Sequence, residues 1–399
     1  MKTFDAAIVG GGLIGASAAF ELAARNLRVV LLDRQQPGRE ASWAAAGMLA
    51  PSPDGPDAQR LVPLAKESFR LYPEFIAAIE GTLGKSCGFA REGTLEIFFG
   101  PEGEWARDAF IEQQQRLGLS SEPLAIEGAR EMEPWLGPKA SAAAWLPTEA
   151  TVDPRLLIDA ALGAAQARGV QIRSHCAVTG LLREGDRCAG VLAGDARIAA
   201  RHVVLAAGCF CSSLDETAQY APTRPVRGQM LSLRGEPVLA RSRPGLAGSK
   251  RQTVRLRRVL RSANGYLVPR PDGRILAGST LENAGYEKAV TPAGVQEIMN
   301  AALELAPALT SVEITEMWAG LRPGTPDNLP ILGPTDIEGL IVATGHYRNG
   351  ILLAPVTAKL VAAWVTGERP ALETDLFSPL RFAHRAVSPA ASTAAPYPL

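Results

Sequence analysis

Residues 5–33 read DAAIVGGGLIGASAAFELAARNLRVVLLD, and this stretch decides the fold. Residues 5–9 (DAAIV), apolar after Asp5, predict a short buried strand, and the alanine-rich segment that ends near Ala24 predicts a helix. A second apolar run at residues 29–32 predicts the next strand, which ends at Asp33. A strand, a helix and a strand in this order are typical of a βαβ unit, so we predict a parallel α/β sheet.

The connection between the first strand and the helix carries a nucleotide-binding pattern. Gly10, Gly12 and Gly15 match G-x-G-x-x-G. Glycines at these positions permit a tight turn, close approach of the backbone to a pyrophosphate and close packing of helix on sheet, while the helix N-terminus faces the negative charge. Asp33 follows Gly15 by 18 residues, where an acid accepts hydrogen bonds from an adenosine ribose. This pattern alone fits NAD as well as FAD.

Two further features favour FAD. The chain has no second G-x-G-x-x-G to hold a nicotinamide cofactor beside a flavin. Residues 42–48 (SWAAAGM) are mostly small, which lets a bulky ring system pass along the backbone. The strand at residues 203–205 leads into a similar tight turn at Gly208, again in the style of a nucleotide-binding domain.

Length and composition restrict the remaining possibilities. A chain of 399 residues is too long for one continuous core, so two domains are expected. Lys+Arg and Asp+Glu both number 41, which removes the simplest argument for a nucleic-acid or anionic-membrane partner. The start of the chain lacks a signal-peptide pattern, and no apolar run reaches the roughly 20 residues of a membrane helix. The five cysteines show no metal or redox spacing, so we expect a cytoplasmic protein without a metal.

A second informative region lies at residues 318–333 (WAGLRPGTPDNLPILG) and 345–355 (GHYRNGILLAP). Its glycines and prolines predict loops around Arg322 and Arg348. An arginine held in a rigid loop is suited to grip a carboxylate through two parallel hydrogen bonds. The alternative is a surface turn with a solvated arginine. The helix predicted from about Pro355 to Val365, which Gly367 closes, is expected to point backbone N–H groups toward a reduced flavin.

Two segments carry weaker patterns. Prolines 63 and 73 predict interruptions in the helical stretch that follows residue 56. Residues 241–261 hold eight basic residues and no acidic one. A functional interpretation of this basic stretch is an anion-binding flap; we favour a solvated, inserted loop, because the run has neither a structural frame nor interleaved aromatic residues.

Five motifs together resemble one family: GGGLIG (10–15), AAAGML (44–49), YLVPR (266–270), WAGLRPGT (318–325) and GHYRNGILLAP (345–355). Over roughly residues 3–370 the chain resembles glycine oxidase, the thiamine-pathway branch of the D-amino-acid oxidase superfamily of flavoproteins. The resemblance implies a Rossmann-like FAD-binding domain (residues 1–83, 148–215 and 318–370). Interleaved with it would be an α+β substrate-binding domain on a mainly antiparallel sheet (residues 84–147 and 216–317). Residues 386–399 are expected to form a disordered tail.

The resemblance also implies roles for individual residues. Arg322 would bind the substrate carboxylate, Tyr266 would add a hydroxyl to it, and Arg348 would line the substrate side of the flavin. The alternative for Tyr266 is a half-buried strand tyrosine. The full set of predicted FAD-binding positions is Gly10, Gly12, Leu13, Ile14, Gly15, Asp33, Arg34, Ala41, Ser42, Ala46, Gly47, Met48, Val178, Gly208, His346, Tyr347, Arg348, Asn349, Gly350, Ile351 and Leu352.

The activity implied is oxidation of glycine to its imine and then glyoxylate, with O2 reduced to H2O2, and the imine would supply the thiazole ring of thiamine. No strong acid or base is needed if the amine arrives neutral and the flavin accepts a hydride. No cysteine follows Cys211, which argues against a covalent flavin of the sarcosine oxidase type, so FAD is expected to bind noncovalently. The resemblance suggests thiazole synthase as a partner, and we expect a homo-oligomer. Alternatives are a D-amino-acid or sarcosine oxidase or dehydrogenase, a flavoprotein that delivers an imine to a partner enzyme, and a nonenzymatic binding protein.

Overall fold

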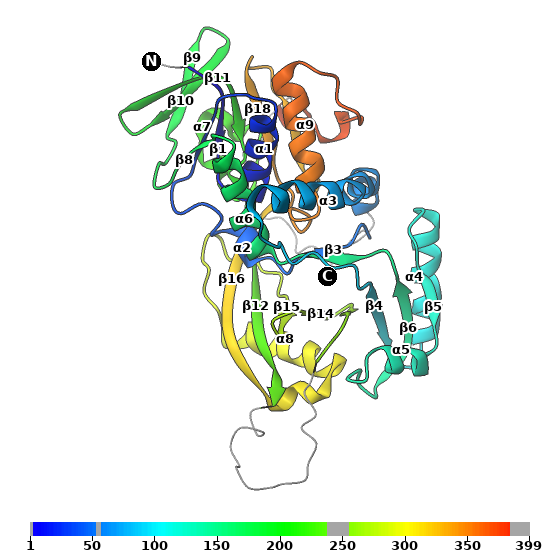
Figure 1. Cartoon of the computed structure of the whole chain (residues 1–399). Helices are drawn as coiled ribbons and strands as arrows, with labels where there is room; N and C mark the ends of the chain where they lie inside the picture. The colour runs from blue at the N-terminus through cyan, green and yellow to red at the C-terminus, as the bar shows by residue number, and fades with distance from the viewer. Residues whose placement is uncertain (1–2, 53–56, 238–254, 384–399) are drawn as a thin grey trace.

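Two eight-stranded sheets organise the computed structural model, which describes residues 3–52, 57–237 and 255–383. In Figure 1 the first sheet lies in the upper part of the molecule and the second in the lower part, with helix α3 between them. The predicted fold class is confirmed: a Rossmann-like α/β part is combined with a part built on a mainly antiparallel sheet. The predicted tail and residues 241–254 of the basic stretch lie outside the described residues.

The first sheet has the strand order β17-β18-β11-β1-β2-β8, and β10 pairs with both β11 and β9. Strand β1 pairs in parallel with β2 and β11, so the predicted βαβ opening is confirmed. The strands are β1 (Phe4–Val9), β2 (Val29–Leu32), β8 (Gln171–Arg173), β9 (Gly180–Glu184), β10 (Arg187–Ala193), β11 (Ala196–Leu205), β17 (Ile331–Pro334) and β18 (Leu340–Thr344).

Helices cover this sheet and bury a core of small residues. Helix α1 (Leu13–Ala24) is buried over most of its length and packs between α6 (Pro154–Ala167) and α9 (Ala354–Thr366). Alanines on α1 and α6 let the helix backbones come close. Asp153 caps α6, since its side chain accepts hydrogen bonds from the backbone of Arg155 and Leu156, as its Asp-Pro pair predicts.

Helix α3 (Val62–Leu83) is continuous, so the predicted interruptions are wrong. Pro63 stands in the first turn, where no intrahelical amide donor is needed. Pro73 lies inside the helix and removes a donor. Tertiary packing offsets that loss: the adjacent Tyr72 is fully buried and its hydroxyl donates to the carbonyl of Ile351 at 2.8 Å.

The second sheet has the strand order β16-β12-β15-β14-β13-β4-β6-β5 and is antiparallel except for the β13–β4 pair. Helix α8 (Pro292–Leu305), which Thr291 caps, packs against its core. The strands are β4 (Thr94–Phe99), β5 (Glu122–Leu124), β6 (Ala140–Leu146), β12 (Arg224–Pro237), β13 (Val259–Ser262), β14 (Gly265–Pro269), β15 (Arg274–Gly278) and β16 (Val312–Gly324). Smaller elements are α2 (Ala41–Ala44), α4 (Gly103–Arg116), α5 (Ile126–Met132), α7 (Asp215–Ala218), α10 (Leu380–Ala383), β3 (Met48–Leu49) and β7 (Ala150–Thr151).

The surroundings of Arg322 form a strand, which corrects the prediction of a loop there. Strand β16 pairs with β12 as far as Gly324, and Arg322 stands opposite Val226. Pro323 is tolerated because β16 is the terminal strand of its sheet and needs donors on one side only. The domain boundary predicted at residue 318 falls inside this strand; the other domain boundaries stay predictions.

The described end of the basic stretch also differs from the predicted solvated loop. Arg261 lies on β13, a central strand, and its partly buried guanidinium lies between two carboxylates. Its Nη1 is 3.0 Å from Glu149 Oε2 and its Nε is 2.5 Å from Glu96 Oε2. This arginine therefore joins parts of the chain instead of facing solvent.

Candidate active site

A cavity of about 520 Å³ extends from the first sheet to the second. At one end it begins beyond the carboxyl ends of β1, β2 and β11, at Val9, Leu32 and Ala206, which is where open α/β sheets bind their ligands. At the other end it reaches Tyr266 on β14 and Arg322 on β16. One cavity therefore joins the nucleotide-type loop to the arginine-bearing strand.

The glycines of the β1–α1 connection are required by close packing. Gly10 has φ +105°, and a Cβ there would lie 2.5 Å from the carbonyl oxygen of Ala206. A Cβ on Gly15 would lie 2.0 Å from the carbonyl oxygen of Gly10. The helix therefore starts directly against the sheet, with its N-terminus at the cavity.

Backbone donors at this helix terminus fit a phosphate group. Gly12 is the N-cap of α1 and provides no side-chain cap, and Leu13 N donates to Ser42 Oγ at 2.9 Å. Within the described parts of the chain, the amide nitrogens of Gly12 and Ile14 have no acceptor. Unpaired N–H groups at a helix N-terminus, together with the helix dipole, favour an anion. The pyrophosphate of FAD fits this end of the cavity.

Asp33 lies beside this loop and lines the cavity. Its Oδ2 accepts from Gly11 N at 2.7 Å, and its Oδ1 accepts from Gln35 N at 2.9 Å. These bonds fix the carboxylate, and each oxygen retains a second lone pair that can accept from a ribose hydroxyl.

An aromatic and charged cluster follows Asp33. The guanidinium of Arg34 lies 3.6 Å above the ring of Phe210, and that ring stacks on Tyr286 with centroids 5.1 Å apart. Glu40 accepts from Arg34 at 3.2 Å and from Lys288 at 3.1 Å. Tyr286 and Lys288 belong to the connection between β15 and α8, so a loop of the second sheet reaches the nucleotide end of the cavity.

At the opposite end, Arg322 is held by backbone and hydroxyl acceptors. Its Nη1 donates to the carbonyl of Arg227 at 3.2 Å and to that of Thr280 at 3.1 Å, and its Nη2 donates to Ser279 Oγ at 2.7 Å. A Cβ on Gly228 would lie 2.1 Å from Nη1 and 2.4 Å from Cζ. The guanidinium therefore occupies the space that a side chain at position 228 would take.

A carboxylate behind Arg322 fixes the segments that supply these acceptors. Glu282 accepts from Arg227 Nη2 at 2.5 Å, from Thr280 Oγ1 at 2.5 Å and from Gln229 Nε2 at 2.8 Å. Burial opposes ionisation, but the hydrogen bonds from Arg227 and Thr280 prevail and lower the pKa of Glu282. This carboxylate stays ionised at neutral pH and ties β12 to the β15–α8 connection.

Two further groups complete the wall. Tyr266 is buried and its hydroxyl is 3.2 Å from Met230 Sδ. His346 is buried beside the cavity, with Nε2 3.0 Å from Thr357 Oγ1. Burial lowers the pKa of His346 to about 3, so the imidazole is neutral at physiological pH and is a weak base.

Most predicted FAD-binding positions line the cavity. The lining includes Gly10, Gly12, Leu13, Ile14, Asp33, Arg34, Ala41, Ser42, Ala46, Val178, Gly208, His346, Tyr347, Gly350 and Ile351. The lining leaves out Gly15, Gly47, Met48, Arg348, Asn349 and Leu352. Arg348 is exposed on the turn before α9 and does not line the cavity. The roles of all these residues stay predictions.

Sequence reasoning missed several lining residues, among them Glu40, Cys209, Phe210, Gly228 and Met230. Cys209 and Phe210 directly follow Gly208, so the turn predicted at Gly208 could have been extended to include them. Gly228 and Met230 lie in a strand with no local pattern that marks a site. Only the pairing of β12 with β16 brings them to Arg322.

Comparison with known proteins agrees with this geometry. A family profile described as FAD dependent oxidoreductase matches residues 5–364. The chain is 36% identical over 369 residues to a bifunctional protein ThiO/ThiG of Trichormus variabilis, covering 92% of this chain and 53% of that protein. It is 34% identical to a glycine oxidase of Pseudomonas putida, covering 93% of this chain and 97% of that enzyme. The chain thus spans about half the length of the bifunctional relatives that it matches.

A solved structure shows the same fold. The crystal structure of glycine oxidase from Geobacillus kaustophilus superposes with a TM-score of 0.84 at 30% identity, covering 95% of this chain and 98% of that one. Among the helices that the structure describes, none has the length and apolar character required to cross a membrane.

Proposed function

We propose that this chain, which belongs to the FAD dependent oxidoreductase family, oxidises glycine with O2 as the electron acceptor. The net reaction converts glycine, O2 and water to glyoxylate, ammonia and H2O2, by way of the imine. The observation that carries this proposal is the continuity of one cavity from the α1 N-terminus to Arg322. The similarity to glycine oxidases over almost their whole length supports the choice of substrate.

The residues at the Arg322 end are suited to orient a small amino acid. Arg322 would bind the substrate carboxylate, because a guanidinium offers a planar, fixed set of donors to it. The hydroxyl of Tyr266, on the neighbouring wall, would donate to the same carboxylate. The acceptors at Arg227, Ser279 and Thr280 hold the guanidinium in place before substrate arrives, which lowers the entropic cost of orientation.

FAD, when bound, supplies an acceptor for a hydride from the carbon next to the amine. The protein's task is then positioning, and none of the groups described at the Arg322 end needs to act as a strong base. The neutral, buried His346 agrees with that assignment. A substrate amine that arrives neutral keeps the lone pair that stabilises the developing imine.

A second proposal concerns the fate of the imine. The bifunctional relatives join ThiO and ThiG in one protein, and this chain spans only about half of their length. This supports thiazole synthase as a partner that receives the imine for the thiazole ring of thiamine. A cytoplasmic location and a homo-oligomeric state also stay proposals.

Oxygen uptake and peroxide formation with glycine, sarcosine, D-alanine and D-proline test the proposed activity. We expect glycine to show the highest kcat/KM. A higher kcat/KM for D-alanine or D-proline would shift the function to a D-amino-acid oxidase of the same family. Peroxide that forms only when thiazole synthase is present would favour the partner-dependent alternative.

A further inference from the structure

Residues 44–46 form one wall of the cavity, and carbonyl oxygens of this wall and of the adjoining Gly47 accept hydrogen bonds from other parts of the chain. Trp318 Nε1 donates to the carbonyl of Ala44 at 3.1 Å, and Val152 N donates to that of Gly47 at 2.9 Å. Arg270 Nη2 donates to the carbonyl of Ala46. A segment of small residues has few side-chain contacts of its own, so these donors determine where its peptide groups lie.

Two backbone amides in this segment, those of Ala46 and Gly47, lack hydrogen-bond acceptors among the described residues. Ala46 lines the cavity and both residues are buried, yet neither amide nitrogen has an acceptor in the described portion of the chain. A buried N–H without an acceptor costs about 1–3 kcal/mol, so native structures rarely leave one unmatched. These amides therefore indicate a ligand acceptor.

The direction of one amide follows from peptide geometry. The carbonyl of Ala46 and the N–H of Gly47 belong to the same peptide group, and in a trans peptide they point in opposite directions. Arg270 does not line the cavity and is only 5% exposed, so it approaches the carbonyl of Ala46 from behind the wall. The N–H of Gly47, which does not itself line the cavity, consequently points away from Arg270, toward the side on which Ala46 lines the cavity.

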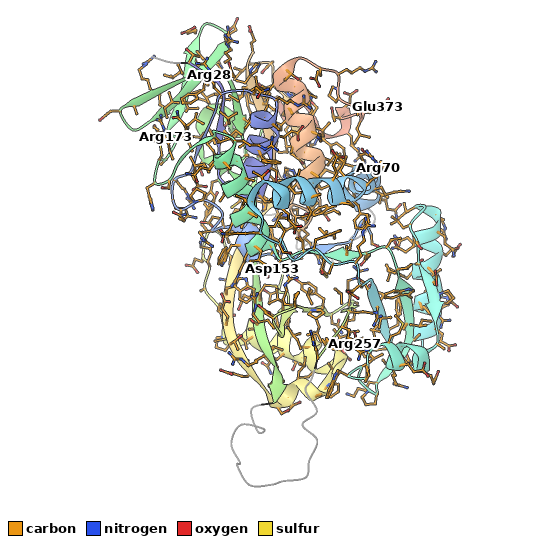
Figure 2. The ribbon with its side chains drawn as sticks, viewed as in Figure 1. Arg28, Arg70, Asp153, Arg173, Arg257 and Glu373 are labelled. Atoms are coloured by element: carbon orange, nitrogen blue, oxygen red, sulfur yellow. The ribbon has the colours of Figure 1, made fainter. Side chains whose placement is uncertain are left out.

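Burying the charged side chain of Arg270 costs stability, and packing alone does not explain why it lies there. Its Nε has no hydrogen-bond partner and lies 3.9 Å from Asp153 Oδ2. Asp153, labelled in Figure 2 between the upper and lower parts of the molecule, is already engaged in capping α6 and in a 3.1 Å contact with Arg274. Burial lowers the pKa of Arg270 to about 10 in spite of Asp153. A buried charge with one long ion pair is a poor source of stability.

We propose that Arg270 is a positioning residue, which fixes the Ala46–Gly47 peptide so that the N–H of Gly47 donates to an acceptor atom of the flavin ring. This proposal rests on the binding of FAD in the cavity described above. It does not depend on which amine is oxidised. Arg270 itself touches neither cofactor nor substrate and acts through the peptide alone.

The test compares Arg270→Met with a matched control, Arg274→Met. Both variants remove an arginine that neighbours Asp153, but only Arg270 contacts Ala46. FAD affinity is measured by titrating FAD-depleted protein and following flavin fluorescence, and the visible absorption spectrum of the holoprotein is recorded. We expect Arg270→Met to weaken FAD binding about tenfold, the worth of one hydrogen bond, and to shift the visible bands. Arg274→Met should leave both unchanged.

A third variant, Arg270→Lys, keeps the charge beside Asp153 and so preserves folding if the methionine variant fails to fold. Its shorter side chain should change affinity and spectrum in the same direction to a smaller extent. Wild-type affinity and spectrum in a folded Arg270→Met, or in Arg270→Lys where the former does not fold, would overturn the proposal. If instead the wild-type chain binds FAD but does not oxidise glycine, the proposed activity fails and the role of Arg270 is still decided by these spectra.

Discussion

Replacing Gly228 by alanine is the sharpest test of the Arg322 site. Gly228 does not have a positive φ, so alanine can adopt its backbone conformation. The added Cβ would lie 2.1 Å from Arg322 Nη1, whereas ordinary contact starts at 3.4 Å. The guanidinium must therefore retreat by more than an ångström or β12 must move away from β16.

The size of the effect follows from the bonds that this shift breaks. Nη1 donates at 3.2 Å to the carbonyl of Arg227, which belongs to β12, so a retreat of more than an ångström away from β12 breaks this bond. Losing one hydrogen bond of a charged group costs about 1.5–3 kcal/mol. If the same loss appears in transition-state binding, kcat/KM for glycine falls roughly 10- to 150-fold. A displacement of about 1 Å at a reacting centre has a similar cost.

Steady-state oxygen uptake over a range of glycine concentrations measures this effect. We expect KM to rise while the FAD content of the purified protein stays that of wild type, because Gly228 lies at the end of the cavity remote from the nucleotide loop. Gly180→Ala is the control: a Cβ there meets only Leu192 at an ordinary 3.5 Å. An unchanged KM in Gly228→Ala would refute the assignment of Arg322 as the carboxylate-binding group.

Three further outcomes are expected. Arg322→Ala should raise KM for glycine by orders of magnitude with FAD still bound, and a wild-type KM would contradict the substrate role. Acid precipitation should release all yellow colour into solution, as noncovalent binding requires; a coloured pellet would show a covalent flavin. Glu133→Gln should remove a pH dependence of thermal stability. Burial raises the pKa of Glu133 from 4.5 to about 7. Its stabilising contribution to the free energy of unfolding is therefore fully present below pH 4.5 and is lost as the pH rises through 7. Unfolding midpoints at pH 5 and 8 should therefore differ more in wild type than in the variant, and equal differences would exclude Glu133 as the source.

Local signals predicted the nucleotide half of the molecule well. The glycine loop, the strand that ends at Asp33 and the Asp153 helix cap each depend on neighbours in sequence, so their structures follow from short-range rules. Gly367 likewise ends α9 with φ +73°.

The substrate half was less predictable because its site is formed by contacts between segments that lie far apart in the sequence. Arg322 is held by acceptors 42, 43 and 95 residues away, and no short window contains them. The glycines and prolines around it predicted a loop, yet Gly320 serves a close approach: a Cβ there would lie 2.3 Å from Ala44 Cβ. Arg261 was predicted to lie in a solvated loop because its neighbours in sequence show no structural frame, although its carboxylate partners lie on β4 and in the connection between β6 and β7.

The connection between β15 and α8 has a thermodynamic consequence. At its start Ser279 and Thr280 hold the guanidinium of Arg322, and farther on Tyr286 and Lys288 rest on Phe210 and Glu40 at the nucleotide end. Two sites that share one segment are coupled, and such coupling is reciprocal. If FAD orders this segment, it raises the affinity for an amino acid by the same factor by which the amino acid raises the affinity for FAD. Through this one connection, the affinity for FAD and the affinity for the amino acid share the same coupling free energy.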